Sequence, residues 1–261
     1  MPIGDVFSFG ARVRFDVVSL FPEMFSALTE WGVTGRAYQR GLTSLRLWNP
    51  RDYANDPHKT VDDRAYGGGP GMVMMAKPLE DTVEAIKAEH QSRGIQTGPI
   101  CLLAPQGEHF SQKIAKDILI YGNLTLICGR YEAVDQRFVD RRVDLQLSIG
   151  DFVVSGGELP AMTMMDAVIR LIPGVLGDED SAAQDSFING LLDHPHYTRP
   201  EIYAEIPVPD VLLGGHHAKI LDWRRQESLR LTSRLRPDLI EAARKNGLLS
   251  KEDERFLLLL K

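Results

Sequence analysis

Short apolar runs rich in Val, Ile and Leu alternate with longer amphipathic segments along the first 176 residues of the chain. This alternation constrains the fold most, because strands that are joined through helices form a mostly parallel sheet with helices on its faces. The sequence therefore predicts an α/β fold. The predicted strands are 15–20, 42–48, 100–104, 124–128 and 144–147, and the predicted helices are 22–27, 77–89, 111–121 and 161–171.

The chain changes character after residue 176. Residues 177–194 are mostly polar or small, and we expect a flexible linker there, because the segment has too few large apolar side chains to form a core element. Helical periodicity then returns, which predicts a small helical C-terminal domain over residues 195–261. Its helical patterns are 218–235, 237–245 and 251–261.

The charge of the chain is unevenly distributed. The net charge of −6 argues against a protein that coats nucleic acid indiscriminately. Residues 193–261 nevertheless carry 12 basic and 11 acidic side chains, whereas residues 1–192 carry 18 and 25. The basic side chains between Lys219 and Arg236 could bind phosphates, or they could form a solvated helix face with local ion pairs.

Several classes of protein are excluded by what the sequence lacks. No apolar run approaches the roughly 20 residues that span a bilayer, and acidic and basic residues interrupt the N-terminal stretch where a signal peptide needs an apolar core. We therefore expect a cytoplasmic protein without a membrane or DNA as partner. Cys101 and Cys128 each lie at an apolar run without a CxxC partner, which favours buried reduced thiols, and no zinc site is expected.

The segment 147–160, LSIGDFVVSGGELP, combines glycines with apolar side chains. Glycines let backbone groups approach a ligand directly, and the apolar side chains could form a wall for a flat nucleoside. A tight turn between two core strands is the alternative. Two further loops, 104–107 and 128–132, also follow predicted strands, where open α/β sheets bind ligands. The dinucleotide fingerprint and the phosphate-binding P-loop are both missing, which argues against NAD and ATP.

Nine sequence blocks cover nearly everything after residue 15. They are SLFPEMF (19–25), VTGRA (33–37), TVDDRAYGGGPGMVM (60–74), APQG (104–107), CGRYEAVDQR (128–137), SIGDFVVSGGELPAMT (148–163), IPGVLG (172–177), DSFINGLLDHPHYTRP (185–200) and the GGHHAKI to WR segment (214–224). In this order they resemble the bacterial tRNA (guanine-N1)-methyltransferases, the TrmD family of the trefoil-knotted SPOUT class. The resemblance implies a SPOUT domain with a parallel-sheet trefoil knot over 15–176 and leaves 1–14 as an N-terminal extension.

The resemblance also implies a reaction, the transfer of a methyl group from S-adenosyl-L-methionine to N1 of guanosine 37 of tRNA, next to the anticodon. A sulfonium methyl group is already activated, so the protein must align donor and acceptor and remove the N1 proton. By resemblance Asp185, in the linker, is the general base, and Arg170 stabilises the negative charge that spreads onto the guanine. From the residues alone, Asp185 could instead be a helix N-cap and Arg170 a helix C-terminal cation.

The resemblance places the methyl donor in the three loops that follow strands. Glu132 and Asp151 could face its positive sulfonium or amino group, although each could equally be a surface or capping residue. The implied donor-binding residues are Leu102, Leu103, Pro105, Gly129, Tyr131, Glu132, Ser148, Ile149, Gly150, Asp151, Phe152, Val153, Val154, Gly156, Gly157 and Pro160.

The family context further implies tRNA as partner and a homodimer in which each active site is shared between subunits. Magnesium is an additional cofactor by resemblance, with Asp62, Asp63 or Asp185 near it, although the sequence has no octahedral ligand set. Cations would hold the tRNA backbone, and aromatic rings could stack on an extruded base. The implied tRNA-binding residues are His196, Tyr197, Arg199, Lys219, Arg224, Arg225 and Arg230.

Two alternatives remain open at this point. A related methyltransferase with another RNA target would keep the donor loops without needing Asp185 or the basic C-terminal helices. A noncatalytic RNA-binding protein on the same scaffold would need neither the glycine loops nor the base. The glycine loops, Asp185 and the basic C-terminal segment are all present in this sequence.

Overall fold

The computed structural model describes residues 13–177 and 184–260. The chain divides into two compact units, Met1–Gly177 and Asp178–Lys261. Most of the expected N-terminal extension lies outside the described residues, as do residues 178–183 of the expected linker.

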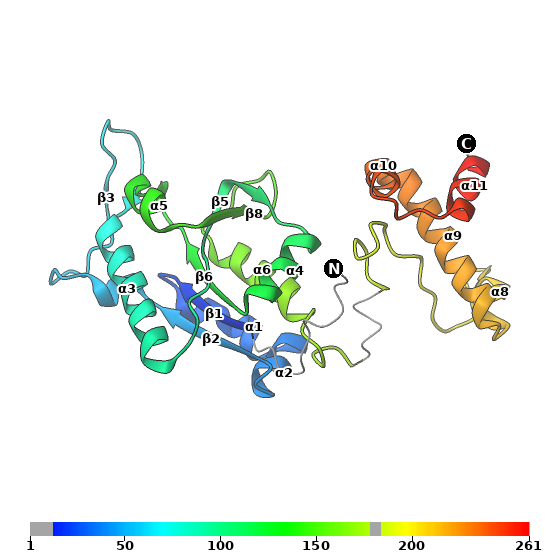
Figure 1. The fold of residues 1–261 in the computed structure, drawn as a ribbon, viewed down its shortest axis with the longest axis horizontal. Coiled ribbons are helices and arrows are strands. Elements are labelled where there is room, and N and C mark those ends of the chain that lie inside the picture. The colour runs from blue at the N-terminus through cyan, green and yellow to red at the C-terminus, as the bar shows by residue number, and fades with distance from the viewer. Residues whose placement is uncertain (1–12, 178–183, 261) are drawn as a thin grey trace. The chain divides into compact units, whose positions relative to one another are not determined.

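A five-stranded parallel sheet forms the centre of the first unit (Figure 1). Each predicted strand is present within a few residues of its predicted ends, which confirms the α/β class. The strand β5 is the exception, because it continues well beyond residue 104. The order across the sheet is β2 (Thr43–Trp48), β1 (Val13–Val18), β6 (Asn123–Cys128), β5 (Ile100–His109) and β8 (Leu145–Ser148).

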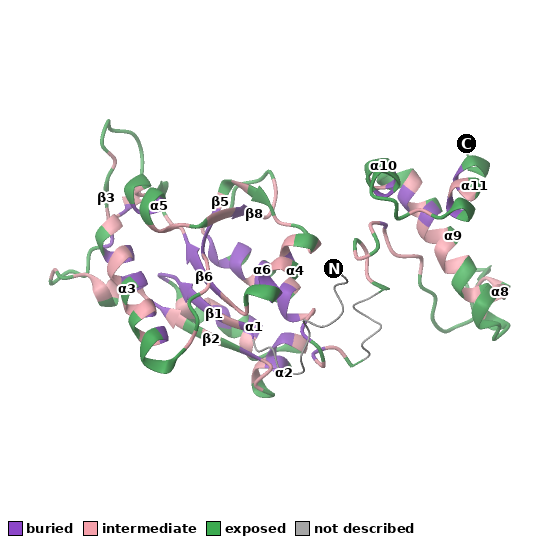
Figure 2. Cartoon of the chain, in the orientation of Figure 1, coloured by how far each residue is buried: buried purple, intermediate pink, exposed green. Residues whose placement is uncertain are grey.

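Helices cover both faces of this sheet, so the strands are buried on two sides (Figure 2). In β5, Cys101 and Leu103 pack into one core, whereas Ile100 and Leu102 pack into the other, as the alternation of side chains along a strand requires. The first core includes side chains of α1 (Ser26–Thr29), α2 (Gly32–Gln39), α4 (Gln112–Tyr121) and α6 (Glu158–Ile169), and the second includes side chains of α3 (Ala76–Arg93) and α5 (Gln136–Arg142).

Two helix predictions differ from the structure. A 3₁₀ turn, η1 (Pro22–Phe25), and α1 stand where one helix, 22–27, was expected. The helix expected over 161–171 begins earlier, at Glu158. The prediction started it after Pro160, but proline is tolerated in the first turn of a helix, where its missing N–H has no intrahelical partner. The helices α2 and α5 and the 3₁₀ turn η2 (Pro50–Tyr53) were not predicted.

A second, three-stranded sheet was also not predicted, because its strands are only two or three residues long. It has the order β3 (Asp62–Arg64), β4 (Met72–Met74) and β7 (Ala133–Val134). The strand β4 pairs antiparallel with β3 and parallel with β7. The segment 60–74 is therefore a hairpin that contacts the chain just after β6.

Four helices and a two-stranded hairpin make up the described part of the second unit. The largest element is α9 (His217–Leu235), which packs against α10 (Pro237–Lys245) and α11 (Lys251–Leu259). The helical patterns predicted there are confirmed within two residues. The remaining elements are α8 (Asp210–Leu213), β9 (Ile202–Tyr203) and β10 (Ile206–Pro207).

Although residues 177–194 were expected to form no core element, one side chain of this segment, Leu191, lies in a core. Its side chain is 3% exposed and lies in one core with Leu229, Ile240 and Leu257. The backbone N–H of Leu192 also donates to Thr232 Oγ1 on α9, at 2.9 Å. One large apolar residue is enough to anchor a polar segment, and this contact between distant residues leaves no periodic pattern in the sequence.

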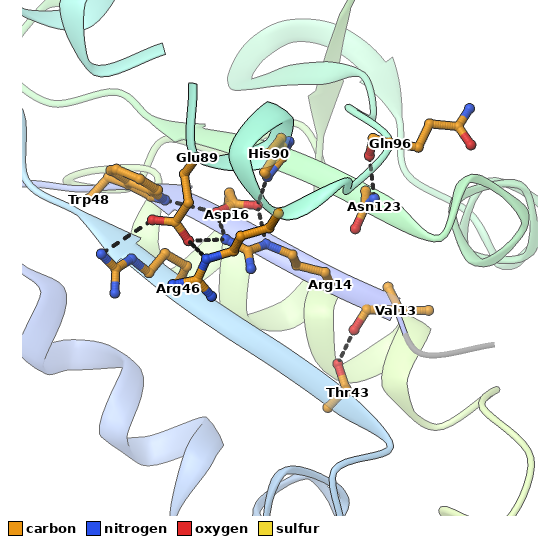
Figure 3. A network of polar contacts seen from close by, with 11 residues as sticks. Val13, Arg14, Asp16, Thr43, Arg46, Trp48, Glu89, His90, Gln96 and Asn123 are labelled. Atoms are coloured by element: carbon orange, nitrogen blue, oxygen red, sulfur yellow. Dashed lines mark hydrogen bonds and ion pairs between the residues drawn. The ribbon is translucent and has the colours of Figure 1, made fainter. Parts of the chain in front are cut away.

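A buried polar network lies on the opposite side of β1 from α6 (Figure 3). The Asp16 carboxylate is fully buried and accepts two hydrogen bonds from Arg14, at 2.8 and 2.9 Å, and one from Trp48 Nε1 at 2.8 Å. The buried His90 Nε2 lies 2.8 Å from the same carboxylate. Burial raises the pKa of Asp16, but the hydrogen bonds from Arg14, Trp48 and His90 outweigh it and leave the pKa below its usual value.

Candidate active site

A cavity of about 220 Å³ lies at the carboxyl ends of β6 and β8 and beside residues 102–106 in the middle of β5. These three strands are adjacent in the sheet, with β5 between the other two, so the irregular middle of β5 and the segments that follow β6 and β8 converge. Fifteen of the sixteen predicted donor-binding residues line this cavity. They are Leu102, Leu103, Pro105, Gly129, Tyr131, Glu132, Ser148, Ile149, Gly150, Phe152, Val153, Val154, Gly156, Gly157 and Pro160.

Asp151 is the one predicted donor-binding residue that does not line the cavity. Its carboxylate lies 2.8 Å from His109 Nε2, and both side chains are largely exposed. Glu132 is therefore the acidic residue in the lining that could face a positively charged group.

The first wall of the cavity comes from an irregularity in β5. Leu147 of β8 is in register with both Leu103 and Glu108, so the intervening residues loop out of the ladder. A side chain at Gly107 would overlap the backbone of Leu147, which keeps this loop close against β8. The displaced segment brings Pro105 and Gln106 to the cavity.

The second wall is the segment that follows β6, and the small sheet supports it. The Glu132 N–H donates to the Met72 carbonyl and the Asp135 N–H to the Met74 carbonyl, both at 2.9 Å. Tyr131 has a φ of 61°, a backbone conformation that costs a non-glycine residue about 1–3 kcal/mol and that surrounding contacts must hold. The hairpin 60–74 therefore shapes the cavity indirectly, by fixing the backbone that follows this strained residue.

The third wall is the glycine-rich segment that follows β8. Gly150 has a φ of 147°, and a Cβ there would lie 2.7 Å from the Phe152 ring, so only glycine fits comfortably. Ser148 Oγ accepts a hydrogen bond from the Gly150 N–H at 3.2 Å. Phe152 and Val153 are 56% and 87% exposed, which leaves apolar surface uncovered at the rim of the cavity.

Gly157 joins the second and third walls at the start of α6. Its N–H donates to the Gly129 carbonyl at 2.9 Å, and a Cβ on Gly157 would lie 2.6 Å from the Cα of Cys128. Close packing of α6 on the end of β6 therefore accounts for this glycine. At Gly129, in contrast, a Cβ would meet only ordinary contacts of 3.6 Å or more.

Arg130 and Glu158, which the sequence interpretation passed over, form an ion pair beside the cavity. Arg130 lines the cavity and donates from Nε to Glu158 Oε2 at 2.8 Å. Glu158 is fully buried and also accepts a hydrogen bond from Ser19 Oγ at 2.7 Å. Both charged residues stand inside glycine-containing blocks of the sequence, and a charge in such a block was the available signal for them.

The two predicted catalytic residues lie in different units. Arg170 is the C-cap residue of α6 in the first unit and is half-buried. Asp185 is half-buried in the second unit, where its carbonyl accepts a hydrogen bond from the Ile188 N–H at 3.3 Å. Their catalytic roles stay predictions.

The predicted tRNA-binding residues all belong to the second unit, and two of the arginines have acidic partners within it. Arg225 donates to both carboxylate oxygens of Asp253, at 2.8 and 3.0 Å, and Arg230 pairs with Glu227. Lys219 is exposed and has no ion pair among the described residues. Tyr197 is exposed, with its ring centroid 6.2 Å from that of Trp223. The others are His196, Arg199 and Arg224.

One group of side chains in the described residues could hold a metal ion, namely Asp193, His194 and His196, whose ligand atoms lie within 4.8 Å of one another. His196 Nε2 is 2.9 Å from Asp193. Burial raises the pKa of Asp193, but hydrogen bonds from His196 and the His194 backbone outweigh it and leave the pKa below its usual value. These contacts already satisfy the carboxylate without a metal.

Both cysteines are free and buried, as predicted. Burial raises the pKa of Cys101 to about 12 and that of Cys128 well above its ordinary value. Neither thiol is therefore a nucleophile at neutral pH. No helix in the described ranges is long and apolar enough to cross a membrane.

The fold and the cavity define a class of protein. An open parallel sheet with a cavity at the carboxyl ends of adjacent strands is the arrangement in which α/β proteins bind small ligands. Within this class, the chain belongs to the family described as tRNA (Guanine-1)-methyltransferase TrmD, which matches residues 13–242.

Individual relatives agree with this assignment over almost the whole chain. A tRNA (guanine-N(1)-)-methyltransferase of Polynucleobacter asymbioticus is 78% identical over 245 residues, which are 94% of this chain and 99% of the relative. Proteins with the same description from Cupriavidus metallidurans and Ralstonia nicotianae are 59% and 60% identical, and each match covers 94% of this chain. The match covers 94% of the Cupriavidus protein and 92% of the Ralstonia protein.

Proposed function

We propose that the chain is a tRNA (guanine(37)-N1)-methyltransferase that uses S-adenosyl-L-methionine as methyl donor. The observation that carries this proposal is the convergence of fifteen predicted donor-binding residues on one cavity at the strand ends. Family membership and relatives described as tRNA (guanine-N(1)-)-methyltransferases support the reaction.

The cavity has the chemistry that the donor requires. Apolar side chains at Leu102, Ile149 and Phe152 can contact the flat adenine, and backbone groups at the glycine positions can hydrogen-bond its polar edge. A Cβ at Gly129 would make only ordinary contacts, of 3.6 Å or more, so packing within the protein does not require this glycine. Glu132 supplies negative charge toward a cationic ligand. The bound donor would supply a methyl group on a positively charged sulfur.

The protein must then prepare the acceptor. We assign Asp185 as the general base that takes the N1 proton of the guanine. The guanidinium of Arg170 would donate hydrogen bonds to the guanine O6, where negative charge develops as N1 loses its proton. From the resemblance to the family, the proposal further includes a homodimer in which Asp185 acts on the donor held by the other chain.

The remaining assignments concern the organisation of the chain. We propose that 15–176 form a trefoil-knotted SPOUT domain, that 177–194 carry the base, and that 195–261 bind tRNA. Phosphate contacts would come from Lys219, Arg199 and Arg224, and Tyr197 would stack on an unpaired base. Magnesium stays a proposed activator, with Asp62, Asp63 or Asp185 as its proposed contacts.

The decisive experiment uses radiolabelled S-adenosyl-L-methionine and paired tRNA transcripts with G or A at position 37. We expect label only in the G37 transcript, and a loss of at least about 100-fold in rate for Asp185→Asn, since general-base catalysis contributes about 10²–10⁴-fold. Asp238→Asn is the matched control, because Asp238 is an exposed carboxylate of the second unit paired with Arg236.

Each outcome of this experiment has a distinct meaning. Label in neither transcript would overturn the assigned substrate and favour another RNA. Equal label in both would overturn the choice of guanosine 37. Full activity of Asp185→Asn would remove Asp185 from the mechanism. A failure to bind the donor in calorimetry would favour a noncatalytic RNA-binding protein.

A further inference from the structure

Glu158 combines two properties that are costly together, a charged side chain and complete burial. It is 0% exposed and is the first residue of α6. Burying a carboxylate is unfavourable unless other groups neutralise it and donate hydrogen bonds to it. Here one oxygen accepts from Ser19 Oγ at 2.7 Å and the other from Arg130 Nε at 2.8 Å. The helix N-terminus adds a favourable dipole at the same place.

Arg130 connects this buried carboxylate to the lining of the cavity. Its Nη1 donates to the Ser155 carbonyl at 3.2 Å, so it holds the glycine-rich segment by its backbone. Its guanidinium carbon lies 4.4 Å from the centre of the Phe21 ring, and its Nη2 lies 3.6 Å from Met24 Sδ. The planar guanidinium is thus fixed by contacts in three directions, which a lysine ammonium could not reproduce.

The side chain of Arg130 also passes directly over the backbone of the third wall. A Cβ at Gly156 would overlap Arg130 Nε and lie 2.5 Å from its Cδ. The position of the Arg130 side chain therefore explains why residue 156 is a glycine, and no bound ligand is needed for this explanation. The segments that begin at Ser19, Gly129 and Ser155 meet at Arg130, and the second and third of these line the cavity.

We propose that Glu158 is a positioning residue for donor binding: acting through Arg130, it fixes the backbone of Ser155 and Gly156 and so sets the shape of the cavity. This inference rests on the proposed function, because the ligand is S-adenosyl-L-methionine. Glu158 itself is fully buried and does not line the cavity.

Two variants test the pair, Glu158→Gln and Arg130→Lys, with donor affinity measured by calorimetry in the absence of tRNA. Glutamine keeps the shape of Glu158 and can still accept from Arg130, whereas lysine keeps the charge of Arg130 but loses the contact that Nη1 makes with Ser155. We expect the Kd for S-adenosyl-L-methionine to rise by about tenfold in each variant, which corresponds to ~1.4 kcal/mol. The Kd of the double variant should exceed that of the weaker-binding single variant by no more than about twofold, because the effects of coupled residues are not additive.

Matched controls separate positioning from general stability. Asp16→Asn neutralises another fully buried, arginine-paired carboxylate in the same unit (Figure 3). Arg142→Lys changes another arginine that bridges acidic side chains, Glu80 at 2.7 Å and Glu84 at 2.9 Å. Neither residue lines the cavity at the strand ends. Both controls should keep the wild-type Kd for the donor, whatever they do to the melting temperature.

Steady-state kinetics supply a second readout that a merely structural role would not move. We expect the KM for the donor to rise in the Glu158 and Arg130 variants, with the KM for tRNA and the kcat at saturating donor within about twofold of wild type. A lower kcat with an unchanged donor KM and Kd would overturn the inference. If the wild-type chain fails to bind the donor, the proposed function fails; if it binds and both variants bind equally well, only the positioning role fails.

Discussion

The Arg130 side chain lies across Gly156, so a methyl group at that position would overlap the arginine Nε. The next residue, Gly157, is constrained by a different neighbour, the Cα of Cys128, at 2.6 Å from a built Cβ. Adjacent glycines in one motif are thus required for separate reasons, one by a side chain that can move and the other by backbone that cannot.

This difference predicts different effects for Gly156→Ala and Gly157→Ala. The second should lower the free energy of unfolding by about 1–3 kcal/mol, because overpacking against β6 forces the backbone apart. The first should cost less stability but weaken donor binding by about tenfold, because Arg130 must leave its place. Urea unfolding and calorimetry measure the two quantities, and the same pattern in both variants would contradict the distinction.

The buried Asp16 network predicts acid sensitivity. The pKa of Asp16 is below its usual 3.8 in the folded chain, so the carboxylate stabilises the fold above pH 3.8 and this contribution is lost as the pH falls through the lower, folded-state value. Asp16→Asn should lower the free energy of unfolding at pH 7 by about 3–5 kcal/mol, because Arg14 is left without its buried partner.

Chemical denaturation at several pH values measures this effect. The difference between wild type and Asp16→Asn should shrink as the pH is lowered below 3.8, because the wild-type carboxylate then also becomes neutral. A difference that stays constant down to the lowest accessible pH would show that the network stabilises the fold without its charge.

Lys219 and Arg225 should behave differently in tRNA binding, although both were predicted as contacts. Lys219 is exposed without an ion pair among the described residues, so Lys219→Ala should weaken binding and reduce the salt dependence of the association constant by about one counterion. Filter binding at several salt concentrations measures the slope. An unchanged slope would remove Lys219 from the interface.

Arg225 is held by Asp253, the residue that completes the capping box of α11. Arg225→Ala should therefore lower the free energy of unfolding by about 1–2 kcal/mol through lost hydrogen bonds to a charged group. Any loss of tRNA affinity has to be measured below the unfolding midpoint of this variant, with its folding checked by circular dichroism. If the variant is as stable as wild type, the ion pair contributes little.

The thiols of Cys101 and Cys128 should be inert in the native protein. Burial raises the pKa of both, so very little thiolate exists at pH 7 and none is accessible. Ellman's reagent should label neither cysteine in buffer and both in denaturant. Rapid labelling of the native chain would show that β5 and β6 open readily.

The regular part of the first unit was predictable from local patterns. Buried parallel strands such as β1 and β6 are short apolar runs, and α3 and α4 show the periodicity of helices, so each element could be predicted from its own residues. The small sheet could not be predicted in this way, because paired residues such as Val73 and Ala133 are distant in sequence and their strands are too short to show alternation. The core position of Leu191 is hidden for the same reason.

The candidate site likewise has features that could be predicted from the sequence and features that could not. Residue order was enough to predict which segments follow the strands and, through the family blocks, which residues gather at one cavity, because the ends of adjacent parallel strands must meet at one edge of the sheet. The contacts that hold the cavity in shape became visible only in the folded chain. The bond from Arg130 to Glu158, the arginine lying over Gly156 and the exposed position of Asp151 depend on distances between separate segments, and residue order does not specify these distances.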